Sequence, residues 1–155
     1  MISKDDKLLS RLQGLCIRKE YCTQDMYKKA LQGLDGDEEG ASEMLALLVA
    51  DRYVDDLRYA SAFARDKAAL EGWGPVKIRY QLSAKGISSE IISQALASVD
   101  GEKADSKLLS ILKAKYRTVK GEPDARLRML KYAMTRGYLY EQAASAVKSV
   151  MSSDE

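Results

Sequence analysis

The sequence predicts an all-α fold, with three tandem three-helix repeats that form an elongated, curved array. Apolar residues recur at helical spacing along nearly all of the 155 residues, and no segment alternates with period two for long enough to predict a sheet. Proline occurs only twice, while alanine, leucine, lysine and glutamate are plentiful, which favours helices. The chain also resembles itself at a period close to fifty residues, as repeat proteins do.

The first repeat is expected over residues 1–54. Leu8, Leu12 and Cys16 recur on one side of its first helix and predict an amphipathic helix with a thiol in the core. Thr23 is a residue type that caps helix N-termini, and we expect it to cap the second helix. The expected helices span residues 6–19, 24–32 and 38–51.

The second repeat, residues 55–100, has the most clearly marked helix ends. Asp55 suits an N-cap, and Pro75 suits a first helical turn, where its missing N–H removes a donor that would lack a partner. Gly86 lies where the chain must turn left-handed to end a helix, and Ser88 can then cap the next one. We therefore expect a positive φ at Gly86. The expected helices span residues 55–71, Pro75 to Gly86, and 89–99.

The third repeat, residues 101–155, is similar to the second. A shift of 51 residues places Lys85 on Arg136 and Gly86 on Gly137, so a positive φ is expected at Gly137 as well. The same shift aligns Lys77 with Arg128, Ile78 with Met129, Leu96 with Val147 and Val99 with Val150. The expected helices span residues 103–119, 123–136 and 140–151. The apolar side of the second of these is expected at Leu127, Leu130 and Met134.

The composition argues against several classes of function. The chain has no histidine, the commonest general base and metal ligand, so we expect no enzyme activity, no metal site and no cofactor. Cys16 and Cys22 are six residues apart, which fits neither a CxxC redox motif nor a zinc knuckle. No apolar run approaches the roughly 20 residues of a membrane span, and the first residues lack a hydrophobic signal segment. We expect a monomeric, cytoplasmic protein that does not bind membranes.

Charge is unevenly distributed, although the net charge is only +2. Residues 35–56 carry eight acidic side chains against one arginine, a net charge of −7, whereas residues 113–136 carry eight basic side chains against two acidic ones, a net charge of +6. Solvated helix faces would give such a pattern too, but one sign clustered over two neighbouring helices favours binding to phosphates or to an acidic protein. The candidate binding residues in the basic segment are Lys113, Arg117, Lys120, Arg128, Lys131 and Arg136.

The central repeat supplies further candidates. Tyr80, between Arg79 and Gln81, is the aromatic residue best suited to an exposed contact. Trp73 lies in a Gly-Trp-Gly turn and is either an interface anchor or a packing residue. The pair of aspartates at 55 and 56 is better explained by helix capping than by a metal or catalytic carboxylate site. The candidate binding residues here are Arg65, Lys77, Arg79, Tyr80 and Lys85.

A spaced set of residues in the same repeat carries a family resemblance: Tyr53, Val54, Asp55, Asp56, Tyr59, Ala60 and Phe63, followed by Gly74, Pro75, Ile78, Arg79, Leu82, Lys85, Gly86 and Ile87. This pattern resembles the signature of the RecX family, whose members are bacterial regulators that bind the RecA recombinase filament. The resemblance covers residues 52–99, with a second short match at 136–139, and Trp73 stands where an aromatic residue, often tyrosine, is usual. It implies three tandem three-helix repeats.

The resemblance also implies a partner, the RecA filament, with DNA contacted directly or through the filament. It implies inhibition of filament extension, of strand exchange and of filament-dependent self-cleavage of other proteins. The alternative is a direct, non-sequence-specific DNA-binding protein that uses residues 113–136, since no helix presents several base-reading side chains at one N-terminus. A scaffold for an unrelated protein would fit the fold but not the basic clustering, and an enzyme is the last choice.

Overall fold

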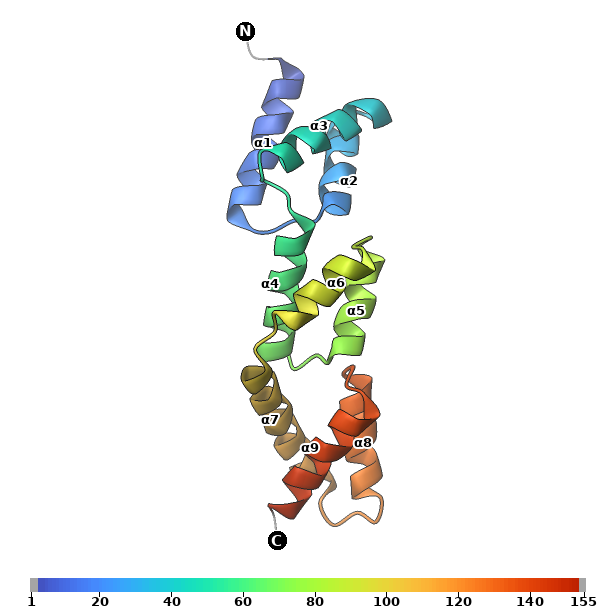
Figure 1. Cartoon of the computed structure of the whole chain (residues 1–155). Helices are drawn as coiled ribbons and strands as arrows, with labels where there is room; N and C mark the ends of the chain where they lie inside the picture. The colour runs from blue at the N-terminus through green and yellow to red at the C-terminus, as the bar shows by residue number, and fades with distance from the viewer. Residues whose placement is uncertain (1–2, 154–155) are drawn as a thin grey trace. The chain divides into compact units, whose positions relative to one another are not determined.

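The computed structural model describes residues 3–153 and contains, within them, nine α-helices and no strand, which confirms the predicted all-α class (Figure 1). The helices are α1 (Lys4–Arg18), α2 (Thr23–Gly33), α3 (Glu38–Ala50), α4 (Asp56–Ala69), α5 (Pro75–Ala84), α6 (Ser89–Ala97), α7 (Gly101–Val119), α8 (Ala125–Thr135) and α9 (Tyr140–Ser152). Over the described range, none of these helices is both long and apolar enough to cross a bilayer.

Several predicted helix ends are confirmed. Helix α5 begins at Pro75, and the side chains of Asp55 and Ser88 each accept a hydrogen bond from the backbone N–H three residues later, at 3.0 and 3.3 Å. Gly86 and Gly137 have φ values of +77° and +99°. These ends follow from local chemistry, because each depends on residues within one helical turn.

The prediction that Thr23 caps α2 is wrong by one residue. Cys22 is the N-cap and makes no side-chain capping bond, while Thr23 is the first helical residue. Thr23 instead donates from its backbone N–H and its hydroxyl to the two carboxylate oxygens of Asp56, at 2.8 and 2.9 Å. The side chain that could have capped α2 thus ties the start of α2 to the start of α4.

The predicted apolar face of α8 is also wrong in part. Leu127 and Met134 are 64% and 46% exposed, and only Leu130 of the predicted three is buried. The other buried positions are Ala125, Met129 and Ala133, which follow one another at intervals of four residues. Small alanines let the helix approach its neighbours closely, so their spacing decides the inward face even though larger apolar residues lie elsewhere.

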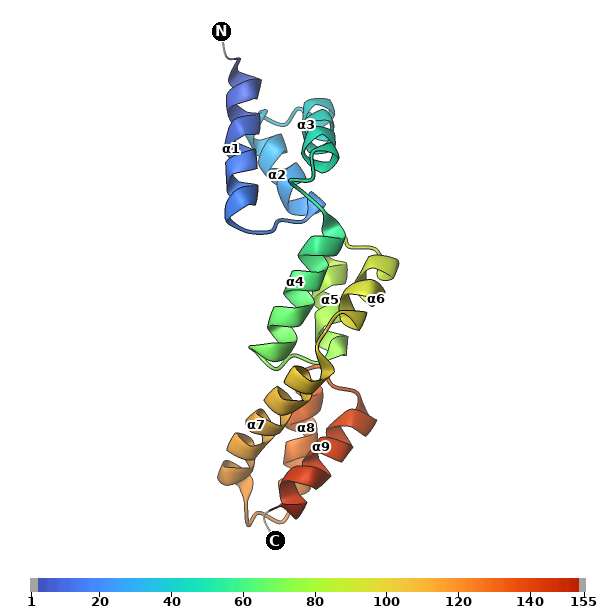
Figure 2. The same ribbon diagram turned by 60° about the vertical axis from the view of Figure 1, so that its left-hand side comes forward.

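The contacts divide the chain into two compact units, each taken by itself. Unit 1 comprises residues 1–62 and 82–94, of which residues 3 onward are described. In it α2 packs against α1 and α3, and the three helices lie side by side in both views (Figures 1 and 2). Its core is apolar, and Cys16 packs at its edge while Cys22 is fully buried. The main core residues are Leu8, Leu12, Met26, Ala30, Ala41, Met44, Leu48 and Val54.

Unit 2 comprises residues 63–81 and 95–155, described as far as residue 153. Helices α7, α8 and α9 each pack against the other two (Figure 2). The largest fully buried side chains of their core are Leu108, Leu112, Met129 and Val147, all at most 1% exposed. Burying a side chain of this size contributes about 1.5–3 kcal/mol to the free energy of folding. This cluster therefore stabilises the packing of α7, α8 and α9 against one another.

The three-repeat division at residues 54 and 100 stays a prediction. The two units each take part of α4, α5 and α6 and so do not correspond to the predicted boundaries one by one. Of the apolar pairs that the 51-residue shift aligns, Ile78 and Met129 are both buried. Leu96 and Val99 are half-buried, whereas their counterparts Val147 and Val150 are buried.

Candidate binding surface

Two turns of unit 2 are joined backbone to backbone. The N–H of Gly74, between α4 and α5, donates to the carbonyl of Arg136 at 2.7 Å, and the N–H of Val76 donates to the carbonyl of Gly137 at 2.9 Å. A Cβ at Gly74 would overlap the Gly137 carbonyl, so glycine is required for this approach. The start of α5 and the end of α8 are therefore held in fixed register.

Arg136 reinforces the same junction. Its guanidinium donates to the backbone carbonyls of Glu71 and Gly72, the latter at 3.3 Å, and its Cζ lies 5.8 Å from the centre of the Tyr132 ring. Guanidinium groups suit such sites because several donors are fixed in one plane. Arg136 was predicted as a binding residue, and the structure places it as a half-buried clamp between turns.

Trp73 is enclosed by an aromatic ring and two lysines. The edge of Phe63 meets it with ring centroids 6.0 Å apart, and the ammonium groups of Lys67 and Lys77 lie 4.7 and 4.3 Å from its centre. Each such cation–π contact at a partly exposed site is worth about 0.5–1 kcal/mol. Trp73 therefore has the packing role that was one of its two predicted roles. Lys77 makes a cation–π contact with its ring.

Lys85, in unit 1, occupies the position that the 51-residue shift equates with Arg136. Its ammonium pairs with the Asp25 carboxylate at 3.0 Å. The hydrogen bond from this lysine to Asp25 is the main cause of a raised pKa for Lys85, against a smaller opposing effect of burial. Lys85 and Arg136 therefore each precede a glycine with a positive φ, and each contacts a residue much earlier in the chain. Lys85 contacts the Asp25 carboxylate, whereas Arg136 contacts two backbone carbonyls. No spacing or motif in the sequence indicates a partner 60 residues away.

The remaining basic candidates of unit 2 are exposed: Lys113 and Arg117 on α7, Lys120 after it, and Arg128 and Lys131 on α8. Arg128 pairs with Asp124 at 3.0 Å, but both side chains are about half exposed, so the pair adds little stability and can be exchanged for a ligand. Both helices present their basic side chains to solvent while their apolar faces form the core.

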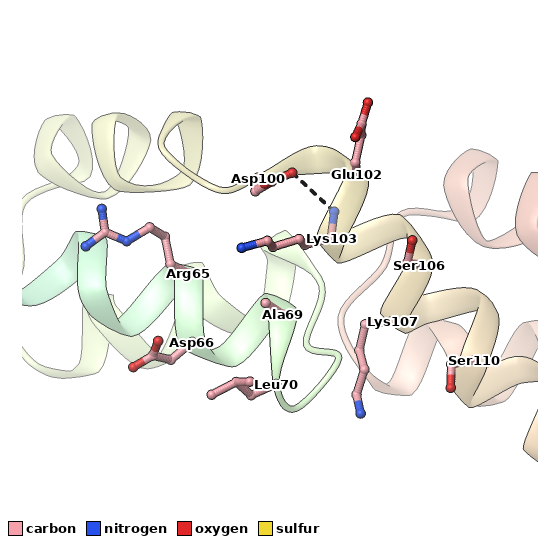
Figure 3. Close-up of a pocket in the computed structure, with 10 residues that line it drawn as sticks. All are labelled: Arg65, Asp66, Ala69, Leu70, Asp100, Glu102, Lys103, Ser106, Lys107 and Ser110. Carbon is pink, nitrogen blue, oxygen red and sulfur yellow. Dashed lines mark hydrogen bonds between the residues drawn. The ribbon is translucent and has the colours of Figure 1, made fainter.

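Another candidate, Arg65 on α4, lines a cleft of about 800 Å³ (Figure 3). Arg65 faces it from α4, and the side chain of Lys103 extends toward it from α7 (Figure 3). Asp66 and Glu102 also line it, and the Asp100 carboxylate is engaged by the Lys103 backbone N–H at 3.2 Å. The cleft thus carries both signs of charge.

Two serines connect this cleft to the basic face of α7. Ser106 and Ser110 line both the large cleft and a neighbouring depression of about 420 Å³ that Lys113 and Arg117 border. Sequence reasoning missed Lys103 and Lys107, which line the same surface. The signal was present, since basic and serine side chains recur every three to four residues along α7.

Helix α5 presents a different kind of surface. Tyr80 is 72% exposed and Val76, one turn earlier, is 50% exposed. Arg79 beside them is also exposed. This face combines an aromatic ring, an aliphatic side chain and a cation, a mixture that protein interfaces favour.

Residues 55–96 match the family model described as RecX, second three-helix domain. The chain is 29% identical over 142 residues to the regulatory protein RecX of Clostridium tetani, which covers 89% of this chain and 65% of that protein. It is 34% identical over 100 residues to the regulatory protein RecX of Xanthomonas citri, covering 64% of this chain and 60% of that protein. The chain thus spans somewhat less than two thirds of the length of these curated relatives.

Two solved structures are similar as well. The crystal structure of RecX from Lactobacillus salivarius superposes with a TM-score of 0.81 over 95% of this chain and 96% of that chain, at 19% identity. At that identity the likeness speaks for the fold alone. A crystal structure of a regulatory protein RecX superposes with a TM-score of 0.75 over 98% of this chain and 72% of that chain, at 26% identity.

Proposed function

Because this chain belongs to the RecX family of regulatory proteins, we propose that it binds the RecA–DNA filament and inhibits the recombinase and filament-dependent activities. The observation that carries the proposal is the similarity to regulatory RecX proteins, which in one relative extends over 89% of the chain. The proposal is for a regulator rather than an enzyme, acting in the cytoplasm as a monomer.

The exposed basic face of unit 2 supports this proposal. A filament of RecA on DNA repeats the same surface many times, so several weak contacts made by one chain raise its effective affinity. A protein held in this way occupies surface that incoming protomers and a second DNA strand would need. The proposed contact residues are the exposed ones: Arg65, Arg79, Tyr80, Lys113, Arg117, Lys120, Arg128 and Lys131.

Lys77, Lys85 and Arg136 are proposed to have a supporting role, because they are less exposed than the other candidates. Each already has a partner within the fold, at Trp73, at Asp25, and at the carbonyls of residues 71 and 72. We propose that they act by holding their own segments of the chain in place beside the exposed residues.

Direct binding to DNA is the second candidate. The observation that favours it is the exposure of a group of cations on α7, on α8 and between them, which includes Lys113, Arg117, Lys120, Arg128 and Lys131. Such a group suits phosphates without reading bases.

Charge reversal on the basic face tests the first proposal. The variant changes Lys113, Arg117, Arg128 and Lys131 to glutamate together. We expect it to require at least tenfold more protein for half-inhibition of DNA-dependent ATP hydrolysis by RecA, because attraction becomes repulsion at four exposed positions. The far-ultraviolet circular dichroism should stay unchanged, since none of the four is in the core.

A matched control reverses four exposed cations of unit 1, with the same change in net charge. These are Lys7, Arg11, Arg18 and Lys28. The control should inhibit nearly as well as the unchanged chain. An equal loss in both variants would show that net charge matters rather than position. Full inhibition by the first variant would move the contact to Arg65, Lys77, Arg79 and Lys85.

A further inference from the structure

Helix α3 is apolar on every side over its second half. The residues from Met44 to Ala50 are all apolar, and together they make about two helical turns. Met44 and Leu48 are buried in the core of unit 1, whereas Leu47 and Val49 are 52% and 44% exposed. A helix that is apolar all round is normally buried on all sides. The outer side of α3 therefore suits a protein surface that covers it.

Acidic side chains border this outer side. The charged residues of α3 are Glu38, Glu39 and Glu43, which give the helix a charge of −3. Glu38 and Glu39 lie in the first turn, where the helix dipole favours carboxylates whatever the partner. Glu43 lies beyond that turn, four residues before Leu47, so the two exposed side chains share one side of the helix. The α3 face consists of Glu39, Glu43, Ala46, Leu47 and Ala50, all of which are exposed.

Helix α8 has an exposed face of the opposite charge. Leu127 and Met134, which are not part of the core of unit 2, are 64% and 46% exposed. Lys131 is also exposed, and its spacing from these two residues, four and three positions, places all three on one side of the helix. The charged residues of α8 are all cations, namely Arg126, Arg128 and Lys131, which give the helix a charge of +3. The α8 face consists of Leu127, Lys131 and Met134.

The α3 face and the α8 face also match in spacing. On α3 the acidic residue Glu43 comes four residues before Leu47, and on α8 Leu127 comes four residues before the basic residue Lys131. Four residues correspond to about 6 Å along a helix. If the two helices run in opposite directions, Leu47 meets Leu127 while Glu43 meets Lys131. Both the apolar and the charged contacts are therefore satisfied in one arrangement.

We propose that the α3 face of one copy of this chain docks on the α8 face of a second copy. The leucines form the apolar centre of the contact, and the Glu43–Lys131 ion pair fixes its orientation. Because the contact joins two different surfaces, it is heterologous. The proposal goes beyond the proposed function and does not depend on it.

The contact is weak, because it is small. One helix face covers less area than the roughly 800 Å² per partner of a stable interface, and we expect a dissociation constant on the order of 100 μM. The chain is therefore a monomer in dilute solution. A partner that holds copies side by side raises their effective concentration to about the millimolar range, so successive copies then bind cooperatively. Lys131 is also a proposed filament contact, and a copy docked on it leaves the filament to the remaining ones.

Sedimentation velocity of the full chain alone, up to about 500 μM, tests the contact. We expect the average mass to rise with concentration above the 17.2 kDa of one chain. Glu43→Lys and Lys131→Glu should each weaken the association at least about tenfold, because each places like charges opposite one another. The chain with both changes should regain the original association within about threefold, because the ion pair is reversed rather than lost.

A mixture of the two single variants tests whether two different faces are joined. The Glu43→Lys chain keeps its α8 face intact, and the Lys131→Glu chain keeps its α3 face intact. The mixture should therefore associate although neither variant does so alone. Arg126→Glu is the matched control, with the same change of charge at an exposed position of α8 outside the α8 face. It should change the association by less than about twofold, since neighbouring residues of a helix do not face the same way.

The apolar part of the contact has its own test. Leu47→Ala should weaken the association about fivefold, because it removes apolar surface from the centre of the contact. Ile17→Ala is the matched control, since Ile17 on α1 is 77% exposed and lies outside both faces. It should leave the association unchanged.

A constant mass up to the highest concentration would overturn the proposal, and so would association that survives both single charge variants. A loss with Glu43→Lys alone, and none with Lys131→Glu, would show that α3 docks on a surface other than α8. The substituted positions are all exposed, so circular dichroism should show unchanged helix content in each variant. These measurements contain no RecA, and their failure leaves the proposed function standing.

Discussion

At Gly137 the backbone has a φ of +99°, a conformation that L side chains rarely adopt, and the space beside it is filled. A Cβ there would overlap Lys77 Cβ and lie 2.6 Å from the backbone nitrogen of Lys77. Gly86, the equivalent position 51 residues earlier, also has a positive φ, but its nearest neighbour is the Gln24 side chain at 3.4 Å, an ordinary contact. A side chain at Gly86 would thus meet backbone strain alone, whereas one at Gly137 would meet both backbone strain and steric overlap.

Substitution of each glycine by alanine should therefore have different effects. Gly86→Ala should lower the free energy of unfolding by about 1 kcal/mol, from the left-handed backbone alone. Gly137→Ala should lower it by at least about twice as much, because the turn at Gly74 must also move. Urea denaturation of both variants measures the difference. Equal losses would mean that the backbone where α5 meets α8 can move at no added cost in free energy.

Some features of single residues could be predicted from the sequence, and others could not. Positive φ at both glycines was predictable, since it depends on a helix end that the neighbouring residues specify. The partners of Lys85 and Arg136 were not, because Asp25 and Glu71 lie at least 60 residues away in sequence and have no spacing that marks them. Long-range polar pairs are set by tertiary packing, which a single sequence does not reveal.

At the scale of single helices, α7 and α8 begin differently. The Asp100 side chain accepts a hydrogen bond from the Lys103 N–H at 3.2 Å, so α7 is capped. The N-cap of α8, Asp124, makes no such bond and pairs with Arg128 instead. One aspartate satisfies a free backbone donor, and the other forms an exposed ion pair.

Asp100→Ala should consequently destabilise the protein by about 1 kcal/mol, the usual effect of losing an N-cap. Asp124→Ala is the matched control and should change the stability by less than about 0.5 kcal/mol, as expected for an exposed pair. Thermal unfolding followed by circular dichroism compares them. A larger loss from Asp124→Ala would show that the start of α8, rather than that of α7, limits the stability of unit 2.

The presence of each helix could be predicted from the sequence, but the buried face of α8 could not. Nine helical segments follow from apolar periodicity, and all nine are found within residues 3–153. On α8 the periodicity allowed two faces, and the one with Leu127 and Met134 was the wrong choice, because Ala125 and Ala133 permit closer packing. Hydrophobicity ranks side chains by size, whereas close helix packing favours small ones. The cleft residues Lys103 and Lys107 were not predicted, because Glu102 and Asp105 lie beside them in sequence and this part of α7 has no clear excess of positive charge.

For the whole molecule, the balance of charge separates the two candidate functions. The net charge is only +2, and residues 35–56 carry a net charge of −7 that would repel naked DNA. A protein surface can accept both signs at once. A binder of RecA filaments therefore differs from a binder of phosphates in its preference among partners.

We expect tighter binding to RecA assembled on DNA than to bare DNA or to RecA alone, by at least about tenfold at physiological salt. Only the assembled filament offers neighbouring protomers for linked contacts. Fluorescence anisotropy of the labelled chain at several salt concentrations measures this. Equal or tighter binding to bare DNA, with a steep loss as salt rises, would favour the direct DNA-binding function instead.

The two compact units alternate along the chain: unit 1 takes residues up to 62 and again 82–94, and unit 2 takes 63–81 and the remainder. This order has a consequence for synthesis. When residue 94 leaves the ribosome, every part of unit 1 is available to fold, while residues 63–81 still await α7, α8 and α9. Ala68 and Ile78, buried in the finished protein, stay uncovered during that interval. No single proteolytic cut releases both units intact, since any fragment that completes unit 1 carries an orphaned piece of unit 2.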